Sequence, residues 1–312
     1  MNEKEWLDYV KKYLFEKKPV IKAGNEDCAV IKINKKYLLF TTDALVENIH
    51  FKLSYTSYFD LGAKLAVSNL SDIASMGGEP KWALLTLGSP QKIRKDWIDP
   101  FMEGLTQTLE KYGACLIGGD TVKSASFFIN LALIGETYNP ILRNGSKPGE
   151  FIFVSKHLGE SSAFLRYIKK GIPLEKIPEN LKKAHLRPEP EIILGKMLSE
   201  NKLATSMIDI SDGLLLDLWR ICEENQIGAE LIENKIPIGK YTTLEEALSG
   251  GEDYALLFTV KKENLEKIGK LSQYLNKPLF CIGTTIKEKK LYLIKDDQKI
   301  QILPRGYIHF TK

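Results

Sequence analysis

Acidic residues stand beside glycine, serine or threonine at six places along the chain, each next to an apolar segment. These places contribute the following acids: Glu26 and Asp27, Asp43, Asp72, Asp120, Asp209 and Asp212, and Glu252 and Asp253. A single aspartate beside glycine usually forms a turn or caps a helix. Several together, with the hydroxyls of Thr41 and Thr42, supply the hard oxygen ligands that Mg²⁺ prefers. The set predicts a magnesium site for a phosphorylated substrate.

Asp72 is the residue that most strongly indicates a bound cation. The segment DLGAKLAVSNLSDIASMGG predicts a helix of about four turns, with Asp60 as its N-cap and Gly77 just past its end. The helix is apolar or small almost all round, which is typical of a buried helix. Yet Ser68, Asn69 and Asp72 form one polar stripe on it. Because burying an unpaired carboxylate costs several kcal/mol, we expect Asp72 to have a cationic partner.

The usual phosphate-binding and catalytic motifs are absent from the sequence. It contains no GxxxxGK[ST] loop, no GxGxxG, no protein-kinase signature and no GxSxG elbow. Histidine is scarce, with four residues and no HExxH spacing. A nucleotide, if one binds, would be held on another scaffold by metal ions and glycine-flanked turns.

Composition excludes several other classes of protein. The net charge is +4, from 44 basic and 40 acidic residues in 312, which is too even for an electrostatic nucleic-acid binder. The cysteines form no CxxC pair, so a thiolate zinc site is not expected. No signal-like apolar core and no run of 18 apolar residues occurs. We therefore expect a cytoplasmic protein without nucleic-acid or membrane partners.

The order of apolar segments predicts a mixed α/β protein in two domains. Strands are expected at 28–33, 35–45, 82–90, 114–122, 127–137, 150–159, 229–233, 253–260 and 279–286, and helices at 4–16, 96–112, 160–170 and 189–200. The strand at 35–45 would end on Thr-Thr-Asp, and that at 114–122 on Gly-Gly-Asp. A further helix would start at Ser211 or Asp212. The Pro-, Gly- and Asn-rich stretch 138–149 marks the boundary between domains 1–140 and 141–312.

Eight stretches in unchanged order resemble the thiamine-monophosphate kinase family, within the aminoimidazole-ribonucleotide-synthetase-like superfamily. The stretches are EDCAVI, TTDALVENIHF, SNLSDIASMGGEPKWALLTL, LIGGDT, HLRPEP, DISDGLLLDL, GGEDYALLF and GYIHF. The resemblance implies two α/β domains, with the N-terminal sheets pairing into a barrel across a homodimer and a cleft near the domain junction. It also implies Mg²⁺-dependent transfer of the ATP γ-phosphoryl group to thiamine monophosphate, giving thiamine diphosphate.

The resemblance also implies roles for individual residues. Metal ligands fall on Asp27, Thr41, Thr42, Asp43, Asp72, Asp120, Asp209 and Asp212. ATP contacts fall on Gly119, Asp120, Arg143 and Ser211, and thiamine-phosphate contacts fall on His50, Glu252 and Tyr307. The first motif departs from the family, since it reads Gly-Asn-Glu-Asp where Gly-Asp-Asp is usual. Asp27 keeps its place before the apolar strand, whereas Glu26 replaces an aspartate.

The residues suit direct transfer between two phosphates. A phosphate monoester has a second pKa of about 6, so the acceptor oxygen is already mostly anionic at neutral pH and needs no general base. No residue stands out as a covalent nucleophile, and in-line transfer is expected.

Two alternatives remain at this point. The chain could belong to a sister family of the superfamily, although it has neither the cysteine tail of the hydrogenase-maturation relative nor the Cys- or Sec-bearing loop of selenophosphate synthetase. It could also be a non-catalytic binding protein that kept the fold. Loss of metal-site aspartates would mark such a protein, and the aspartates are present.

Overall fold

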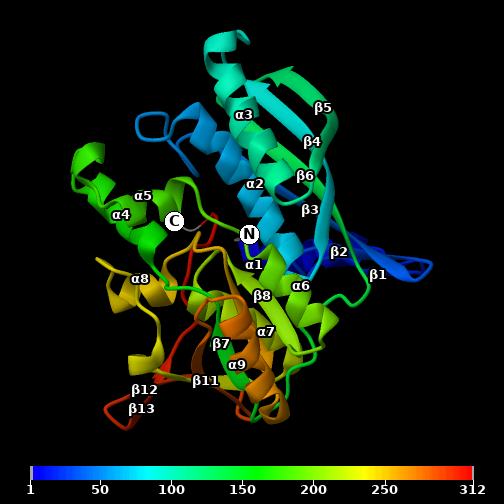
Figure 1. The fold of residues 1–312 in the computed structure, drawn as a ribbon, viewed down its shortest axis with the longest axis vertical. Coiled ribbons are helices and arrows are strands. Elements are labelled where there is room, and N and C mark those ends of the chain that lie inside the picture. The colour runs from blue at the N-terminus through cyan, green and yellow to red at the C-terminus, as the bar shows by residue number, and fades with distance from the viewer. Residues whose placement is uncertain (1–2, 311–312) are drawn as a thin grey trace.

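The computed structural model describes residues 3–310 and contains two mixed β-sheets (Figure 1). The N-terminal sheet has the strand order β1-β2-β3-β6-β4-β5, with the bounds β1 Val20–Lys22, β2 Ala29–Ile33, β3 Lys36–Val46, β4 Glu79–Ser89, β5 Cys115–Lys123 and β6 Phe128–Thr137. The C-terminal sheet has the order β13-β12-β9-β11-β7-β10-β8, with the bounds β7 Phe151–Val154, β8 Ser206–Ile210, β9 Gly228–Ile232, β10 Ala255–Val260, β11 Phe280–Ile286, β12 Leu291–Lys295 and β13 Gln298–Ile302.

Helices lie around and between the two sheets. Their bounds are α1 Glu3–Val10, α2 Tyr58–Ser75, α3 Lys95–Lys111, α4 Glu160–Lys169, α5 Glu179–Leu186, α6 Ile192–Glu200, α7 Leu214–Asn225, α8 Leu244–Ser249 and α9 Leu265–Tyr274. Short 3-10 turns are η1 Lys11–Tyr13, η2 Leu174–Lys176, η3 Glu233–Lys235 and η4 Lys262–Asn264. Within the described residues, no helix combines the length and the apolarity that crossing a membrane requires.

Helix α2 is the central element of the fold. In Figure 1 it runs from the upper half, which holds the N-terminal sheet, toward the lower half, which holds the C-terminal sheet. Its apolar side chains share one hydrophobic core with both sheets, including Leu70 and Ile73 of α2, Leu133 of β6 and Phe258 of β10. The expectation of a buried helix here is confirmed, because nearly every α2 residue is buried.

The N-terminal end of α2 differs from the prediction, whereas its C-terminal end agrees. The N-cap is Ser57, whose hydroxyl accepts a hydrogen bond from the Asp60 N–H at 3.1 Å, so the assignment of Asp60 as N-cap was wrong. Asp60 lies in the first turn instead, where a carboxylate interacts favourably with the helix dipole. Gly77, with φ of +68°, follows the helix as predicted, since a left-handed residue at this place favours glycine.

Close packing of α3 on α2 depends on glycine. A Cβ atom on Gly104 of α3 would lie 2.0 Å from the carbonyl oxygen of Phe59, a distance that no side chain tolerates. The two helices therefore approach with backbone nearly in contact. This contact fixes the N-terminal end of α2 against the rest of the N-terminal unit.

Strand β3 does not end on Thr-Thr-Asp, as the sequence had suggested. It continues to Val46 and pairs along its length with β6, where Asp43 is opposite Leu131. Alternation along the strand then places Thr41 and Asp43 on the same face as the buried Leu39, toward α2, and Thr42 on the opposite face. Two hydroxyls that adjoin in the sequence are thus divided between the two faces of one sheet.

Other predictions about element ends also need correction. Strand β5 does not end at Asp120 but runs on to Lys123. Helix α7 has Gly213 as its N-cap, so neither Ser211 nor Asp212 starts the helix. The carboxylate of Asp217 accepts hydrogen bonds from the backbone N–H groups of Asp212 and Gly213 at 3.1 and 3.0 Å. It satisfies the N–H groups of the two residues that lead into α7, and so fixes the start of the helix.

Candidate active site

Three carboxylates meet between the two sheets. Oxygen atoms of Asp27, Asp72 and Asp209 all lie within 4.8 Å of one another. Asp27 comes from the loop before β2, Asp72 from the last turn of α2, and Asp209 from β8 of the C-terminal sheet. The site therefore needs both halves of the chain, with α2 between them.

Hydrogen bonds from neighbouring residues fix this cluster. The Thr41 hydroxyl donates to Oδ2 of Asp72, and the Ser71 hydroxyl donates to Oδ2 of Asp209 at 2.6 Å. The backbone N–H of Asp43 donates to the side-chain oxygen of Asn69 at 3.1 Å. These bonds attach β3 to the polar stripe that the sequence shows on α2, and β8 to the adjacent Ser71.

Burial and repulsion from neighbouring acids disfavour the charged forms of Asp72, Asp209 and Asp43. Burial raises the pKa of Asp72 well above its usual range, and the charges of Asp43, Asp209 and Asp27 raise it further. Burial and the charge of Asp27 likewise raise the pKa of Asp209. Burial, with smaller contributions from Asp212 and Asp27, raises the pKa of Asp43 to about 6, although a hydrogen bond from Ser68 opposes this. Such a group of acids is short of positive charge.

The donor chemistry of the cluster fits a hard divalent cation. Within residues 3–310, the buried Oδ2 atom of Asp27 has no hydrogen-bond partner. A buried carboxylate oxygen without a partner is costly, and a metal ion is one of the groups that would satisfy it. The described residues Asp27, Asp72 and Asp209 could hold such an ion through oxygen atoms.

Arg143 supplies positive charge at one side of the cluster. Its guanidinium group donates to Oδ1 of Asp27. Its backbone N–H donates to Glu26 at 2.8 Å, and burial raises the pKa of Glu26 to about 7. Glu26 thus ties the Arg143 loop to the segment that carries Asp27, which gives the unusual residue of the first motif a local role.

Asp212 lies where three segments of the C-terminal half meet. Its carboxylate accepts a hydrogen bond from Arg220 at 2.6 Å, and its carbonyl oxygen accepts one from the Tyr307 N–H at 2.8 Å. The carbonyl oxygen of Ser211 accepts a hydrogen bond from the Glu252 N–H at 2.7 Å. The DISDG and GGEDY stretches are therefore neighbours in space, and the C-terminal GYIHF segment packs on them.

His50 and Tyr307 lie together in an aromatic group that also contains His309. The ring centres of His50 and His309 are 5.3 Å apart, and those of Tyr307 and His309 are 4.8 Å apart. Nδ1 of His50 accepts a hydrogen bond from the Val46 N–H at 3.0 Å. Burial lowers the pKa of His50, and the charge of His309 lowers it further. The ring is therefore predominantly neutral at neutral pH.

Sequence reasoning missed three residues of this region. His309 stands two positions after Tyr307 in GYIHF, a spacing that could have drawn attention to it. Lys64 and His185 contact Glu252, at 2.7 Å for the Lys64 ammonium and 3.3 Å for Nδ1 of His185. A lysine inside an otherwise apolar helix was the available signal for Lys64.

Three residues assigned by resemblance do not join the carboxylates in this chain. The Thr42 hydroxyl accepts a hydrogen bond from Asn130 at 2.7 Å on the other face of the sheet. Gly119 and Asp120 lie on the exposed strand β5, three strands from β3, or roughly 14 Å at the usual strand spacing. Packing requires glycine at position 119, because a Cβ there would lie 1.9 Å from the Leu85 carbonyl oxygen.

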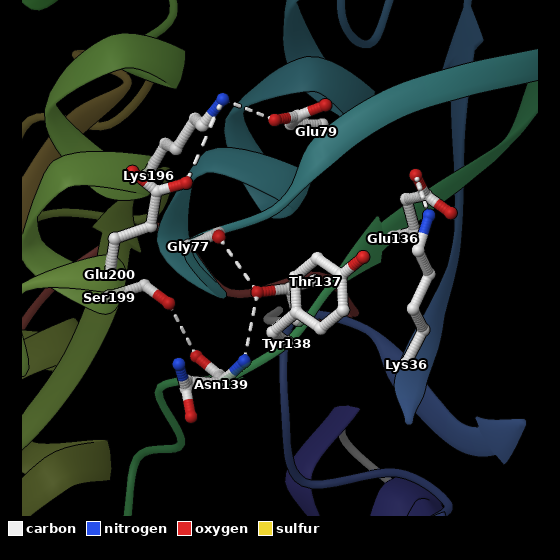
Figure 2. Close-up of a pocket in the computed structure, with 10 residues that line it drawn as sticks. All are labelled: Lys36, Gly77, Glu79, Glu136, Thr137, Tyr138, Asn139, Lys196, Ser199 and Glu200. Atoms are coloured by element: carbon white, nitrogen blue, oxygen red, sulfur yellow. Dashed lines mark hydrogen bonds and ion pairs between the residues drawn. The ribbon is translucent and has the colours of Figure 1, made fainter. Parts of the chain in front are cut away.

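A small pocket away from the carboxylate cluster is lined by ion pairs. Figure 2 shows it between β6 and α6, and its volume is about 60 Å³. Lys196 of α6 forms ion pairs with Glu79 and Glu200, and Lys36 pairs with Glu136 at 2.8 Å. None of the residues assigned to metal, ATP or substrate lines this pocket. We attribute it to the contact of α6 with the N-terminal sheet.

Comparison with known proteins shows the family. Residues 25–137 match the family model of AIR synthase related protein, N-terminal domain, and residues 147–296 match that of the C-terminal domain. Thiamine-monophosphate kinase of Buchnera aphidicola subsp. Schizaphis graminum is 39% identical over 97% of this chain and 96% of its own length. That of Haemophilus influenzae is 38% identical over 92% and 91%. The chain belongs to the thiamine-monophosphate kinase family.

Solved structures agree with this membership of the thiamine-monophosphate kinase family. A structure described as AaThiL complexed with AMPPCP and TMP covers 99% of this chain and 97% of its own, with a TM-score of 0.86 and 31% identity. Hydrogenase maturation protein HypE of E. coli has a TM-score of 0.72 at 17% identity, which shows a shared fold alone. The expectation of a mixed α/β, AIR-synthase-like fold in two domains is confirmed.

Proposed function

We propose that this protein transfers the γ-phosphoryl group of ATP to thiamine monophosphate, giving thiamine diphosphate and ADP. The cluster of Asp27, Asp72 and Asp209 carries the proposal, because partly or fully buried acids without enough positive charge suit the binding of cations that accompany phosphates. A relative solved with an ATP analogue and TMP supports the choice of substrates.

Magnesium is the ion that we expect at the cluster. Asp27, Asp72 and Asp209 would hold it, with Asp43 and Thr41 close by on β3. The unpartnered oxygen of Asp27 and the raised pKa values of Asp72 and Asp209 support this assignment. When bound, Mg²⁺ would neutralise phosphate charge and align the reacting groups. More than one ion would be expected from the number of acids nearby.

The chain's own residues suit direct, in-line transfer. The acceptor phosphate is mostly ionised at neutral pH, so no side chain has to remove a proton. Arg143 and Arg220 place positive charge beside Asp27 and Asp212, where they could contact ATP phosphates. Cys28 is the thiol beside the cluster, but burial raises its pKa and it donates to the Asp72 carbonyl oxygen. It is unsuited to act as a nucleophile.

We assign the thiamine end of the acceptor to His50, Glu252 and Tyr307. Tyr307 is 47% exposed, so part of its surface lies open to a ligand. A thiazolium cation above that ring would gain cation–π attraction. The carboxylate of Glu252 would accept a hydrogen bond from the amino group of the pyrimidine ring.

We also propose a homodimer formed by the outer face of the N-terminal sheet. Large apolar side chains are exposed there, among them Trp82 and Leu84 at 43% and Val122 at 46%. An apolar sheet face of this kind is typical of a protein contact and could close into a barrel with a second copy. Asp120 and Gly119 lie on the same exposed region, so any contact of theirs with ATP would depend on that arrangement.

We further propose that residues 1–140 form the metal, ATP and dimerisation domain and residues 141–312 complete the cleft. The change of sheet between β6 and β7 supports this division. Free thiols at Cys28, Cys115, Cys222 and Cys281 are compatible with the reducing cytoplasm that the sequence led us to expect.

Release of ADP tests the proposed reaction. The purified chain would be given ATP and Mg²⁺ with thiamine monophosphate, free thiamine or formylglycinamidine ribonucleotide. We expect ADP release with thiamine monophosphate that EDTA abolishes. Release only with the purine precursor would move the chain to a sister activity. Binding of nucleotide without ADP release in any mixture would indicate a non-catalytic protein.

A further inference from the structure

Lys64 is a buried charge in the middle of the apolar helix α2. Its side chain is 1% exposed, and its ammonium nitrogen lies 2.7 Å from Oε1 of Glu252. Glu252 belongs to the C-terminal half and its side chain is 24% exposed, so the pair joins the buried helix to a surface that ligands can reach. A lysine is rarely buried in this way unless it has a defined partner.

His185 of α5 completes the environment of Glu252. Its Nε2 atom lies 3.4 Å from the Lys64 ammonium, which can only donate, so Nε2 must be the acceptor and Nδ1 carries the proton. Nδ1 lies 2.9 Å from the Ser161 hydroxyl and 3.3 Å from Oε2 of Glu252. Burial, with the charge of Lys64, lowers the pKa of His185 to about 3. The ring is neutral, and Lys64 is the cation that faces Glu252.

The two oxygens of Glu252 are therefore held by different donors. Lys64 binds Oε1 and His185 faces Oε2, while each oxygen keeps room for a further hydrogen bond. The backbone of Glu252 has φ of +63°, a conformation that is uncommon for a residue with a side chain. Backbone strain of this kind often accompanies functional positions, and here it holds the carboxylate toward α2.

We infer that Lys64 is a positioning residue for the acceptor. Lys64 holds Glu252 as an ionised carboxylate aimed at the amino group of the pyrimidine ring. The inference rests on the proposed function. Lys64, Ser68 and Asp72 lie on one face of α2, and eight residues of helix span about 12 Å. This separation is similar in scale to an extended thiamine monophosphate molecule. One rigid helix would thus position both the phosphate end and the pyrimidine end of the acceptor.

A purely structural role explains Lys64 less well. Buried ion pairs are often replaceable by apolar residues without loss of stability, because desolvation offsets the attraction. The helix around Lys64 is already packed by apolar side chains such as Leu61 and Leu65. Burial tends to raise the pKa of Glu252, yet the charge of Lys64 brings it below its usual value. Lys64 therefore acts on the charge of Glu252 more than on the packing of α2.

Steady-state kinetics with two acceptors test the inference. Oxythiamine phosphate carries a carbonyl in place of the pyrimidine amino group, so an ionised Glu252 should discriminate against it. The variants are Lys64→Met, Glu252→Gln and the double variant, with Lys270→Met as control. Lys270 forms an exposed pair with Glu266 on α9, so its loss should change nothing. Melting temperatures would be measured for every variant.

We expect Lys64→Met to raise KM for thiamine monophosphate by about ten- to a hundredfold, the range for a lost hydrogen bond to a charged group. KM for ATP should stay within twofold of wild type, and the preference for thiamine monophosphate over the oxo analogue should fall. The double variant should be no worse than Glu252→Gln alone, because Lys64 would act through Glu252. If Lys64→Met is too unstable to assay, the comparison of the double variant with Glu252→Gln still tests whether Lys64 acts through Glu252. The double variant can be assayed because it carries no unpaired buried charge.

An unchanged KM and an unchanged preference in Lys64→Met would overturn the inference, as would a double variant clearly worse than Glu252→Gln. A wild-type protein that leaves thiamine monophosphate unphosphorylated would overturn the proposed function, and the inference with it. The two failures are distinguishable, because the first occurs in an active enzyme.

Discussion

Replacing Asp72 by asparagine should stabilise the ligand-free protein while it abolishes turnover. Two unit charges 4.8 Å apart at an effective dielectric of 20 repel by about 3.5 kcal/mol, and Asp72 lies within that distance of both Asp27 and Asp209. Partial protonation, the Arg143 charge beside Asp27 and the loss of the Thr41 hydrogen bond all reduce this gain, so we expect about 3 kcal/mol net. For a chain of this size, the melting temperature would rise by up to roughly ten degrees.

The sign of the effect depends on pH. The pKa of Asp72 is raised in the folded protein, so its ionisation costs stability as the pH rises from the unfolded value near 4 through the folded value. The gain in stability from Asp72→Asn should therefore vanish toward pH 4 and grow as the pH rises above it. Mg²⁺ should raise the melting temperature of the wild type at pH 8 and leave that of the variant nearly unchanged.

Differential scanning calorimetry with and without Mg²⁺ would measure the melting temperatures of both proteins, and ADP release would measure their turnover. Asp60→Asn is the matched control, since Asp60 lies in the first turn of the same helix and pairs with Arg187. Its loss should lower the free energy of unfolding by about 1 kcal/mol or less, and the melting temperature only slightly. A less stable Asp72→Asn protein that keeps its response to Mg²⁺ would refute the reasoning and make Asp72 a structural residue.

Three further predictions concern the acceptor pocket, the ionic contact of α6 and the dimer. Tyr307→Ala should raise KM for thiamine monophosphate about three- to thirtyfold, and a raised KM for ATP alone would mean that the two pockets are reversed. Hydrogen bonds, first from Lys196, lower the pKa of Glu79 to about 2, so that stability is present above the unfolded value near 4.5 and lost as the pH falls toward 2. The difference in melting temperature between wild type and Lys196→Met should therefore shrink from pH 5 to pH 2.5, and a constant difference would exclude this pair as its cause. Leu84→Arg should convert a dimer into monomers in light scattering, and a monomeric wild type would contradict the proposed interface.

Much of the fold could be predicted because its strands and its central helix are strongly patterned. The polar stripe on α2 was visible in the sequence, as was the end of the helix at Gly77. The start at Ser57 was not, because Asp60 is an equally good capping residue and only the path of the chain decides between them. The C-terminal hairpin of β12 and β13 and the helix α5 lacked a strong apolar period, since their burial depends on contacts with distant segments.

The acids of the candidate site could be predicted from the sequence, but their arrangement in space could not. Asp27, Asp72 and Asp209 are 45 and 137 residues apart along the chain, by subtraction of their numbers, and only the fold brings them together. Thr41 and Thr42 looked equivalent until β3 was seen to continue through them. In a strand, neighbours point to opposite faces, so one hydroxyl reaches Asp72 and the other reaches Asn130. Lys64 passed unnoticed because its partner is 188 residues away by the same subtraction.

The burial of α2 explains the behaviour of both Asp72 and Lys64. Water is excluded around the helix, so the charges of Asp72 and Lys64 act strongly on their neighbours instead of being screened. In the last turn of α2, this makes a group of acids that is costly without a cation, and about two turns earlier it makes one ion pair that fixes a carboxylate. A helix packed on all sides cannot easily shift to relieve either condition. Under the proposed function, the burial of these charges fixes the distance between the groups that bind the phosphate end and the pyrimidine end of the acceptor.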